Sequence, residues 1–354
     1  MFVNHIHYRA IWPESNFKSV SIIDQTKLPF HFEHVQIDTL EKMIHAISCM
    51  QVRGAPLIGA SAAYGLALAM LNDSSNAHLC LAAEQLIQSR PTAVNLAWAV
   101  NRMVLHLTHL LPHERVSAAW LEAAKIADED VEQNRMIGQH GLALIAQAYQ
   151  EKTFHILTHC NAGWLATVDF GTALSPIYAA HDAGLALHVW VDETRPRNQG
   201  ASLTAWELGQ HGVPHTVISD NAGGHLMQQG QVDMVIVGAD RVAANGDVCN
   251  KIGTYLKALA ADDNQIPFYA AVPSPTIDIE LAHGRDIVIE ERHHDEVAYM
   301  QGHTADGRLQ SVRVIPVHSN AANPAFDVTP ARLVTGIITE KGVFAPNQLA
   351  KGIG

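Results

Sequence analysis

The sequence predicts an α/β protein: a small, mostly helical N-terminal domain with a few strands, then a Rossmann-like, doubly wound domain on a parallel sheet. Two observations support this prediction. Before Thr153 the apolar residues recur mainly at helical spacing, and after it short β-branched and aromatic runs alternate with helical segments. Such alternation indicates right-handed crossovers with helices on both sheet faces. We therefore expect domains at residues 1–150 and 151–354.

The N-terminal half begins with short strands and continues as helices. Ser19–Ile23 and His34–Ile37 are strand-like and flank a turn at Asp24–Pro29. Four segments then carry apolar residues near helical spacing, and a fifth, longer one stays helical although it contains two glycines. The expected helices are Thr39–Met50, Pro56–Leu71, Asn76–Arg90, Leu96–Leu111 and Ser117–Tyr149.

Five apolar runs predict the strands of the second domain: Phe154–His159, Ala186–Val191, His215–Ser219, Met234–Val237 and Phe268–Val272. The segments between them predict helices at Gly171–Ala183, Gln199–Gln210, Gly223–Gln229 and Asn250–Ala261. A strand at Ser311–Pro316 and a closing helix at Pro330–Thr335 are expected to complete the domain. The GxGxxG fingerprint of a dinucleotide site is missing after the first strand, which argues against a nicotinamide dehydrogenase.

The composition excludes several classes of partner. A formal charge of −12 argues against a nucleic-acid binder, which would show a basic face. It still allows a phosphorylated small molecule, because a few cations and backbone N–H groups can hold one phosphate. The longest apolar stretch, Leu57–Leu71, contains Gly, Ala and Ser and is too short to span a bilayer, so we expect a buried helix and no membrane partner.

The cysteines and histidines show no metal-binding pattern. The four cysteines have no CxxC spacing, and Met1–Trp12 does not resemble a signal peptide, so reduced thiols and a cytoplasmic location are expected. The 22 histidines include no HExxH motif and no zinc-ligand spacing. His293 and His294, beside Asp295, are expected in a solvated loop or helix start. We therefore predict no metal site.

Reactive residues follow three of the predicted strands. Cys160 follows the first, Asp192, Glu193 and Arg195 the second, and Asp240 the fourth. The carboxyl ends of parallel strands share one sheet edge, so these side chains are expected to form a site. Helix N-terminal amides there would lower the pKa of a thiol. The alternatives are a buried, unreactive cysteine and a helix-capping aspartate, and at least one acid is expected to be structural.

Three cations at expected helix starts or turns point to an anion. Arg53 precedes Gly54, Ala55 and a proline, and Arg90 lies in a turn. Asn250 and Lys251 are expected to open a helix, where a lysine is unfavourable unless an anion is bound. Each cation alone is more often solvated, but together they favour a phosphate site.

The chain resembles the methylthioribose-1-phosphate isomerases of methionine salvage. These are the enzymatic branch of a superfamily that also contains ribose-1,5-bisphosphate isomerases and regulatory subunits of the exchange factor for translation initiation factor two. The resemblance covers nearly the whole chain and rests on long motifs in the family's order: VRGAPLIGASAAYG (Val52–Gly65), SRPTAVNL (Ser89–Leu96), EDVEQNRMIGQHG (Glu129–Gly141), LTHCNAGWLAT (Leu157–Thr167), DETRPRNQGASLTAWEL (Asp192–Leu208), GADRVAANGDVCNKIGTY (Gly238–Tyr255), PAFDVTPA (Pro324–Ala331) and IITEKGV (Ile337–Val343).

The resemblance implies an aldose–ketose isomerase that converts 5-methylthioribose 1-phosphate to 5-methylthioribulose 1-phosphate. It implies that Cys160 and Asp240 are the acid/base pair, that the enzyme is a homodimer, and that it needs no organic cofactor or metal. The implied contacts to the substrate's phosphate and hydroxyls are Arg53, Gly54, Ala55, Arg90, Gln199, Asn250 and Lys251.

Two segments depart from the family's usual sequence. Ala162-Gly163-Trp164 stands where Thr-Gly-Ala is common, which would put the large ring of Trp164 near the site, and Gln301–Arg313 resembles an insertion. The alternative functions to a methylthioribose-1-phosphate isomerase are a 5-deoxyribose-1-phosphate isomerase, a ribose-1,5-bisphosphate isomerase, or a non-catalytic regulatory subunit of the same superfamily.

Overall fold

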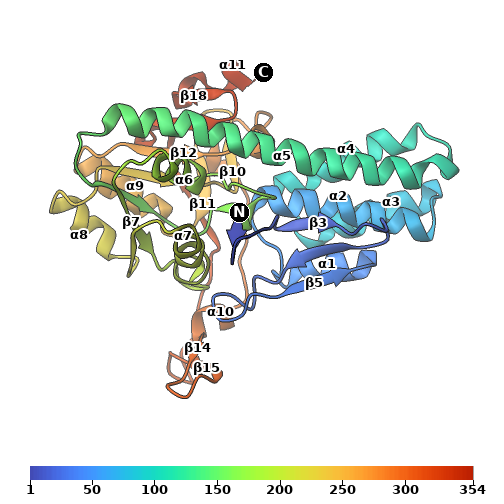
Figure 1. The fold of residues 1–354 in the computed structure, drawn as a ribbon, viewed down its shortest axis with the longest axis horizontal. Helices are drawn as coiled ribbons and strands as arrows, with labels where there is room; N and C mark the ends of the chain where they lie inside the picture. Colours follow the sequence, from blue (N-terminus) through green and yellow to red (C-terminus); the bar gives the residue numbers. More distant parts are fainter. Residues whose placement is uncertain (354) are drawn as a thin grey trace.

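A seven-stranded sheet forms the centre of the C-terminal half in the computed structural model, which describes residues 1–353 (Figure 1). Its strand order is β18-β17-β12-β9-β6-β7-β8, and every neighbouring pair is parallel except β17 and β18. From β6 the chain continues to β7 and β8 on one side of the sheet, and from β9 it continues to β12 and β17 on the other. β6 and β9 therefore flank the point where ligands bind in doubly wound sheets. The strands are β6 (Phe154–Thr158), β7 (Leu187–Asp192), β8 (His215–Ile218), β9 (Met234–Val237), β12 (Phe268–Ala271), β17 (Gly336–Thr339) and β18 (Gly342–Phe344).

Apolar residues alternate between the two faces of this sheet, and both faces are covered. Ile156 and Ile236 belong to one hydrophobic cluster, whereas their neighbours Leu157 and Val237 belong to the other. Burial on both faces explains why the strands read as continuous apolar runs. The helices that follow the strands are α6 (Leu174–Asp182), α7 (Ala205–His211), α8 (Ala222–Gln228) and α9 (Thr254–Asp263).

The N-terminal half is mostly helical, as predicted. A three-stranded antiparallel sheet, β3 (Ile11–Pro13), β4 (Val20–Ile23) and β5 (His34–Ile37), lies beside the helices, and β1 (Phe2–Val3) pairs with β2 (Ile6–His7). The helices are α1 (Leu40–Ser48), α2 (Ala55–Asn72), α3 (Asn76–Ser89) and α4 (Val94–Thr108). By length and composition α2 could cross a membrane, but 83% of it is buried inside the protein, as expected of a core helix.

The longest helix connects the two halves. α5 (Pro112–Ala148) runs for 37 residues and continues through both of its glycines. It packs on α2 and α4 along one part and on α6 and β17 along the other, as its course across the molecule shows (Figure 1). The domain boundary expected at residue 150 therefore follows a helix that belongs to both packing units, and it stays a prediction.

The helix predicted over Asn250–Ala261 is wrong at its start. Asn250 and Lys251 end a buried strand, β11 (Val248–Lys251), and α9 begins only at Thr254. β11 pairs with β16, a strand far away in the sequence, and that pairing overrides the local pattern. The second sheet has the order β13-β10-β11-β16, from β10 (Arg241–Ala243), β13 (Ile277–Asp278) and β16 (Phe326–Thr329).

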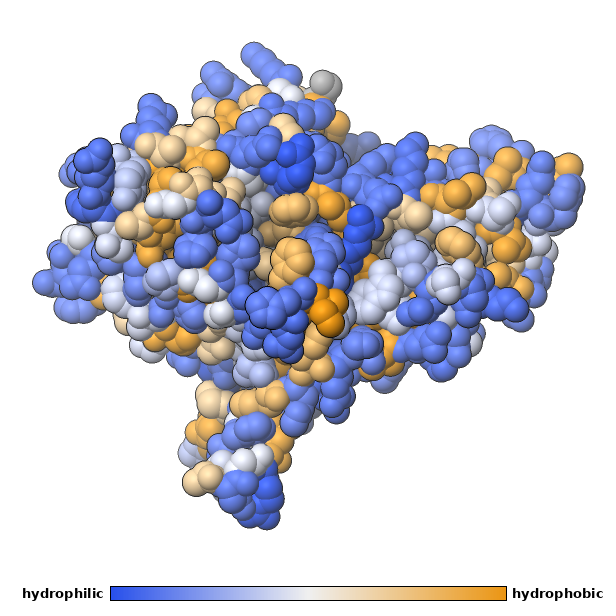
Figure 2. Space-filling view, viewed as in Figure 1, coloured by the Kyte–Doolittle hydropathy of each residue, from blue (hydrophilic) through white to orange (hydrophobic). Residues whose placement is uncertain are grey.

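Two late elements also differ from the prediction, one in its bounds and pairing and one in its type. The strand expected at Ser311–Pro316 is β15 (Leu309–Arg313), which pairs only with β14 (Tyr299–His303) in a hairpin that projects from the body (Figure 1). Its surface mixes hydrophilic and hydrophobic residues (Figure 2), so no buried apolar face ties it to the core. The closing helix at Pro330–Thr335 is a single 3₁₀ turn, and the strand that closes the parallel part of the sheet is β17.

The remaining elements are short. Two small helices, α10 (Asp295–Ala298) and α11 (Leu349–Ile353), lie at the base of the hairpin and near the C-terminus. Single helical turns occur at Trp164–Ala166, Ser274–Thr276, Gly284–Asp286, Ala331–Leu333 and Pro346–Gln348, and a π-helical turn at Gly200–Thr204.

Candidate active site

A pocket of about 620 Å³ opens beyond the carboxyl ends of β6 and β9. The structure brings all nine predicted site residues together in its wall: Arg53, Gly54, Ala55, Arg90, Cys160, Gln199, Asp240, Asn250 and Lys251.

Cys160 sits just beyond β6 in a constrained backbone conformation. Its φ is 68°, in the left-handed region that non-glycine residues rarely adopt. Two hydrogen bonds hold its peptide groups: its N–H donates to Thr194 Oγ1 at 2.8 Å, and its carbonyl accepts from Thr204 Oγ1 at 2.6 Å. A strained residue that its surroundings hold in this way is typical of functional sites.

Burial dominates the protonation of both candidate catalytic groups. Desolvation raises the pKa of the Cys160 thiol, although Arg53 and Lys251 partly oppose that rise. The expectation that helix amides would lower this pKa is therefore wrong, because the loss of water outweighs the nearby positive charges. Desolvation also raises the pKa of Asp240. The positive charges of Lys251, Arg90 and Arg53 lower it by less, so the neutral carboxyl group is favoured.

Arg53 is held against the loop that follows Cys160. Its guanidinium donates to Asn161 Oδ1 at 2.5 Å and to the Asn161 carbonyl at 2.8 Å. Gly54 makes this approach possible: its φ is +104°, and a Cβ there would lie 2.4 Å from the Ala166 carbonyl oxygen. The glycine thus lets the N-terminal half reach the strand ends and complete the pocket.

Lys251 is a buried cation in the pocket wall. It is buried in β11 opposite Phe326, and its Nζ lies 4.5 Å from the centre of that ring. Within residues 1–353 its ammonium group has no ion pair or hydrogen bond, and desolvation lowers its pKa. Arg90, by contrast, pairs with Glu290 at 3.1 Å. A buried ammonium group without an anionic partner is well suited to bind a phosphate.

Two amide side chains add uncharged polar groups to the wall. Gln199 precedes the π-helical turn, and its buried Oε1 has no hydrogen-bond partner within the described residues. The Asn250 amide donates to Thr254 Oγ1 at 3.0 Å, which leaves its Oδ1 available. Such groups are suited to sugar hydroxyls, which both donate and accept hydrogen bonds.

The acids and the arginine after β7 do not line this pocket, contrary to prediction. Asp192 is fully buried behind it, where its Oδ2 lies 2.8 Å from His159 Nδ1 and 3.2 Å from Lys257 Nζ. Glu193 is also outside the pocket wall, and Arg195 donates to the Val297 carbonyl near the hairpin base. The expectation that at least one strand-end acid is structural is confirmed for Asp192.

The ring of Trp164 is not at the site either. It is completely buried, tilted against Trp206 with 6.2 Å between ring centres. Sequence reasoning missed other wall residues, several of which flank Cys160 or Asp240 within the quoted motifs. They are Met50, Pro56, His159, Asn161, Ala162, Ala166, Thr172, Gly238, Ala239 and Phe326.

A buried carboxyl group supports the loop after Cys160. Glu207 accepts hydrogen bonds from the Asn161 amide at 2.8 Å, the Tyr178 hydroxyl at 2.8 Å and the Trp164 N–H at 2.9 Å. Because it is completely buried, desolvation raises its pKa from 4.5 to about 7. Glu207 thereby connects the protein core to Asn161 and, through it, to Arg53.

Glu207 should make stability depend on pH. Its folded-state pKa is above its unfolded value, so its stabilising contribution is complete below pH 4.5 and is lost as pH rises through about 7. The loss is on the order of 3 kcal/mol. Urea unfolding of the wild type and of Glu207→Gln at pH 5 and pH 8 should show a smaller pH dependence in the variant. Equal pH dependence in both proteins would contradict this assignment.

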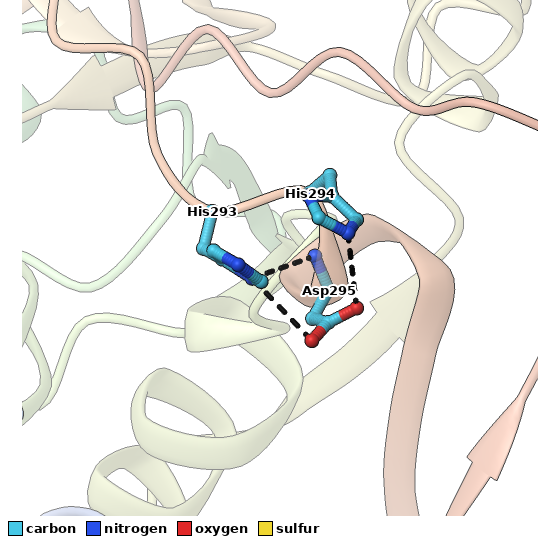
Figure 3. A group of neighbouring side chains, drawn as sticks. All are labelled: His293, His294 and Asp295. Carbon is cyan, nitrogen blue, oxygen red and sulfur yellow. Dashed lines mark hydrogen bonds and ion pairs between the residues drawn. The ribbon is translucent and has the colours of Figure 1, made fainter.

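Among residues 1–353, two clusters have metal-ligating side chains. His293, His294 and Asp295 face one another on one turn (Figure 3), with side chains 67%, 60% and 54% exposed. They are three consecutive residues in a solvated helix start, as predicted, without a buried second set of ligands. In the other cluster, of His159, Asp192 and Asp220, the Lys257 ammonium already supplies the cation.

The chain is similar to proteins of known name over nearly its full length. The model of the initiation factor 2 subunit family matches residues 51–346. A methylthioribose-1-phosphate isomerase of Acidiphilium cryptum is 61% identical, over 99% of this chain and 96% of that protein. The corresponding protein of Gluconobacter oxydans is 59% identical, over 97% of this chain and 95% of that protein.

Solved structures agree with these relatives. The 5-methylthioribose 1-phosphate isomerase of Pyrococcus horikoshii matches with a TM-score of 0.82 and 42% identity, covering 98% of this chain and 95% of that chain. A protein of A. fulgidus described as translation initiation factor eIF-2B subunit delta matches with a TM-score of 0.81 and 40% identity, covering 98% and 99%. The chain therefore belongs to the initiation factor 2 subunit family and, within it, to the methylthioribose-1-phosphate isomerases.

Proposed function

We propose that this protein isomerises 5-methylthioribose 1-phosphate to 5-methylthioribulose 1-phosphate in methionine salvage, with Cys160 and Asp240 as the acid/base pair. The observation that carries the proposal is the pocket itself. It joins two buried acidic groups to three cations in a chain 59–61% identical to isomerases of that name.

The substrate's chemistry explains why acid catalysis is needed. The phosphate on the anomeric oxygen prevents the spontaneous ring opening of a free hemiacetal, so the enzyme must cleave the bond between C1 and the ring oxygen. That oxygen needs a proton as it leaves. The raised pKa of Asp240 favours the carboxyl form, which can supply this proton, and the Asp240 carboxylate then remains in the site.

The cations and amides provide binding and orientation. Arg53, Arg90 and Lys251 are suited to the phosphate, and their charge also stabilises negative charge on it during ring opening. Gln199 and Asn250 are suited to the ribose hydroxyls. Because Arg53 comes from the N-terminal half and Lys251 from β11, one substrate would be held by both halves of the chain.

Two routes can complete the isomerisation, a proton route and a hydride route, and burial of the Cys160 thiol favours the hydride route. A proton route needs a base to remove the C2 hydrogen, and because burial favours the neutral Cys160 thiol, the Asp240 carboxylate left by ring opening would have to act alone. A hydride route moves the C2 hydrogen with its electron pair to C1. The C2 hydroxyl then loses its proton to the Asp240 carboxylate by way of the Cys160 thiol, which takes up one proton as it passes on another, so both groups are regenerated for the next turnover.

An isotope label distinguishes these routes. We expect substrate deuterated at C2 to give product that keeps the deuterium at C1 when the reaction runs in ordinary water. Proton NMR of the product measures this retention. Complete exchange of the label with solvent would favour the proton route and contradict the hydride route.

The activity itself is tested by proton and phosphorus NMR. We expect the purified protein to convert 5-methylthioribose 1-phosphate at enzyme-like rates without nucleotide, and equally well with a chelator, since no metal or cofactor is proposed. Faster turnover of 5-deoxyribose 1-phosphate or ribose 1,5-bisphosphate would change the proposed substrate. A folded protein that is inactive on all three, but retains translation-factor subunits in a pull-down, would instead be a regulatory subunit.

The proposal extends to assembly and organisation. We propose a cytoplasmic homodimer whose protomers each have an N-terminal domain of residues 1–150 and a catalytic domain of residues 151–354. The named relatives and the substrate's metabolic character support a cytoplasmic enzyme. Sedimentation equilibrium measures the assembly, and a monomer's mass would contradict the dimer.

A further inference from the structure

We infer that His159 is a positioning residue that holds Lys251 and Cys160 in place from behind the pocket. The inference rests on the proposed function for its kinetic consequences, because it assigns Lys251 to phosphate binding and Cys160 to the chemistry. Its structural basis is the imidazole ring, which joins the ends of three strands.

Both ring nitrogens of His159 are occupied. Nε2 lies 2.8 Å from the Ile252 carbonyl oxygen, which can only accept, so Nε2 carries a hydrogen and donates. Nδ1 lies 2.8 Å from Asp192 Oδ2. Although His159 contributes to the pocket wall, its side chain is completely buried and has no free polar atom to offer a substrate. It therefore acts through its neighbours.

The Asp192 contact fixes the ring to the core. Asp192 ends β7, and its Oδ2 also pairs with Lys257 Nζ at 3.2 Å, while the same ammonium group donates to the Asp220 carbonyl. The Asp192 carbonyl accepts from Thr194 Oγ1 at 3.0 Å, and that oxygen accepts the Cys160 N–H. Thr194, two residues beyond the end of β7, thus holds the strained Cys160 backbone, and His159 binds directly to Asp192 at the same strand end.

The Ile252 contact reaches Lys251. Ile252 directly follows Lys251, so Nε2 fixes the Ile252–Gly253 peptide, one residue beyond the cation. The chain approaches the ring closely here: Gly253 has a φ of +103°, and a Cβ at this position would lie 2.9 Å from His159 Cε1. Since the Lys251 ammonium group has no partner of its own among the described residues, the backbone and the Phe326 ring determine where it points.

Two amide substitutions separate the two contacts. Asparagine places its nitrogen near the position of Nδ1, and the longer glutamine places it near Nε2. We expect His159→Asn to keep the Asp192 contact and lose the Ile252 contact, raising KM roughly tenfold with kcat little changed. We expect His159→Gln to keep KM and lower kcat roughly tenfold, because Cys160 loses its second attachment to β7.

A matched control and a double variant complete the test. The control is His155→Asn, which changes a half-buried histidine in β6, the strand that precedes His159, and it should leave KM and kcat unchanged. His159→Asn combined with Lys251→Ala should raise KM no further than Lys251→Ala alone, because the histidine acts through that lysine. Additive effects, or a loss of activity in both His159 variants that only tracks the unfolded fraction, would overturn the inference.

Phosphate binding distinguishes failure of this inference from failure of the proposed function. Calorimetry with inorganic phosphate needs no turnover, and we expect His159→Asn to bind phosphate roughly tenfold more weakly than wild type or His159→Gln. A wild type inactive on every sugar phosphate would refute the isomerase, while this difference would still support the role of His159. Equal phosphate affinity in all three proteins would refute that role whatever the activity.

Discussion

Asp240→Asn and Cys160→Ala will each reduce kcat to near background while the protein remains folded. Asparagine cannot give its proton to the leaving ring oxygen, and alanine removes the thiol next to the reacting carbons. Loss of one acid/base group typically costs roughly 10²–10⁴-fold in rate. Both groups lie in the pocket wall at the ends of neighbouring strands, so no other described side chain duplicates either position. The NMR assay under saturating substrate measures kcat.

Cys249→Ala is the matched control for the thiol. Cys249 is also buried, but it lies outside this pocket, and burial raises its pKa to about 12. It should keep wild-type kcat, and thermal unfolding of all three variants should show intact folding. Near wild-type kcat in Cys160→Ala or Asp240→Asn would remove that residue from the mechanism.

Lys251→Ala and Arg53→Ala will raise KM for the sugar phosphate. A charge-assisted contact to phosphate contributes about 1.5–3 kcal/mol, which corresponds to roughly ten- to hundredfold in affinity. The effect of Lys251→Ala should be mainly on KM, since within residues 1–353 the ammonium group has no hydrogen-bond or ion-pair partner that its loss would leave unpaired. Arg53→Ala should also destabilise the protein, because its two hydrogen bonds to Asn161 join the N-terminal half to the strand ends.

The control for charge is Lys125→Ala on the outer face of α5. The Lys125 side chain is 63% exposed, and its ammonium group lies 3.9 Å from a Glu129 carboxylate oxygen. A surface ion pair this long contributes little, so removing the lysine should leave KM unchanged. Wild-type KM should also rise with ionic strength if the phosphate is bound by charge. An unchanged KM in Lys251→Ala would place the phosphate elsewhere in the pocket.

Local sequence was sufficient for most of the fold. Apolar runs such as Met234–Val237 are strands because both of their faces are buried, and helical spacing identified α1 to α4 within a few residues at each end. Local sequence was also sufficient to identify Cys160 and Asp240 as candidate site residues. A reactive residue just beyond a buried parallel strand lies at the sheet edge where ligands bind. The expectation failed for Asp192, because local sequence does not say which strand-end side chain turns toward the pocket.

The amino-acid sequence by itself determined the doubly wound fold, the family and nine of the residues of the pocket wall. Only the tertiary structure decided that Lys251 ends a strand opposite Phe326, that β17 lies beside β12, and that His159 joins Asp192 to Ile252. The physical reason is that helical spacing and buried runs are local properties of the chain. Strand pairing, the water lost around Cys160 and the contacts of His159 instead depend on partners that folding alone brings together.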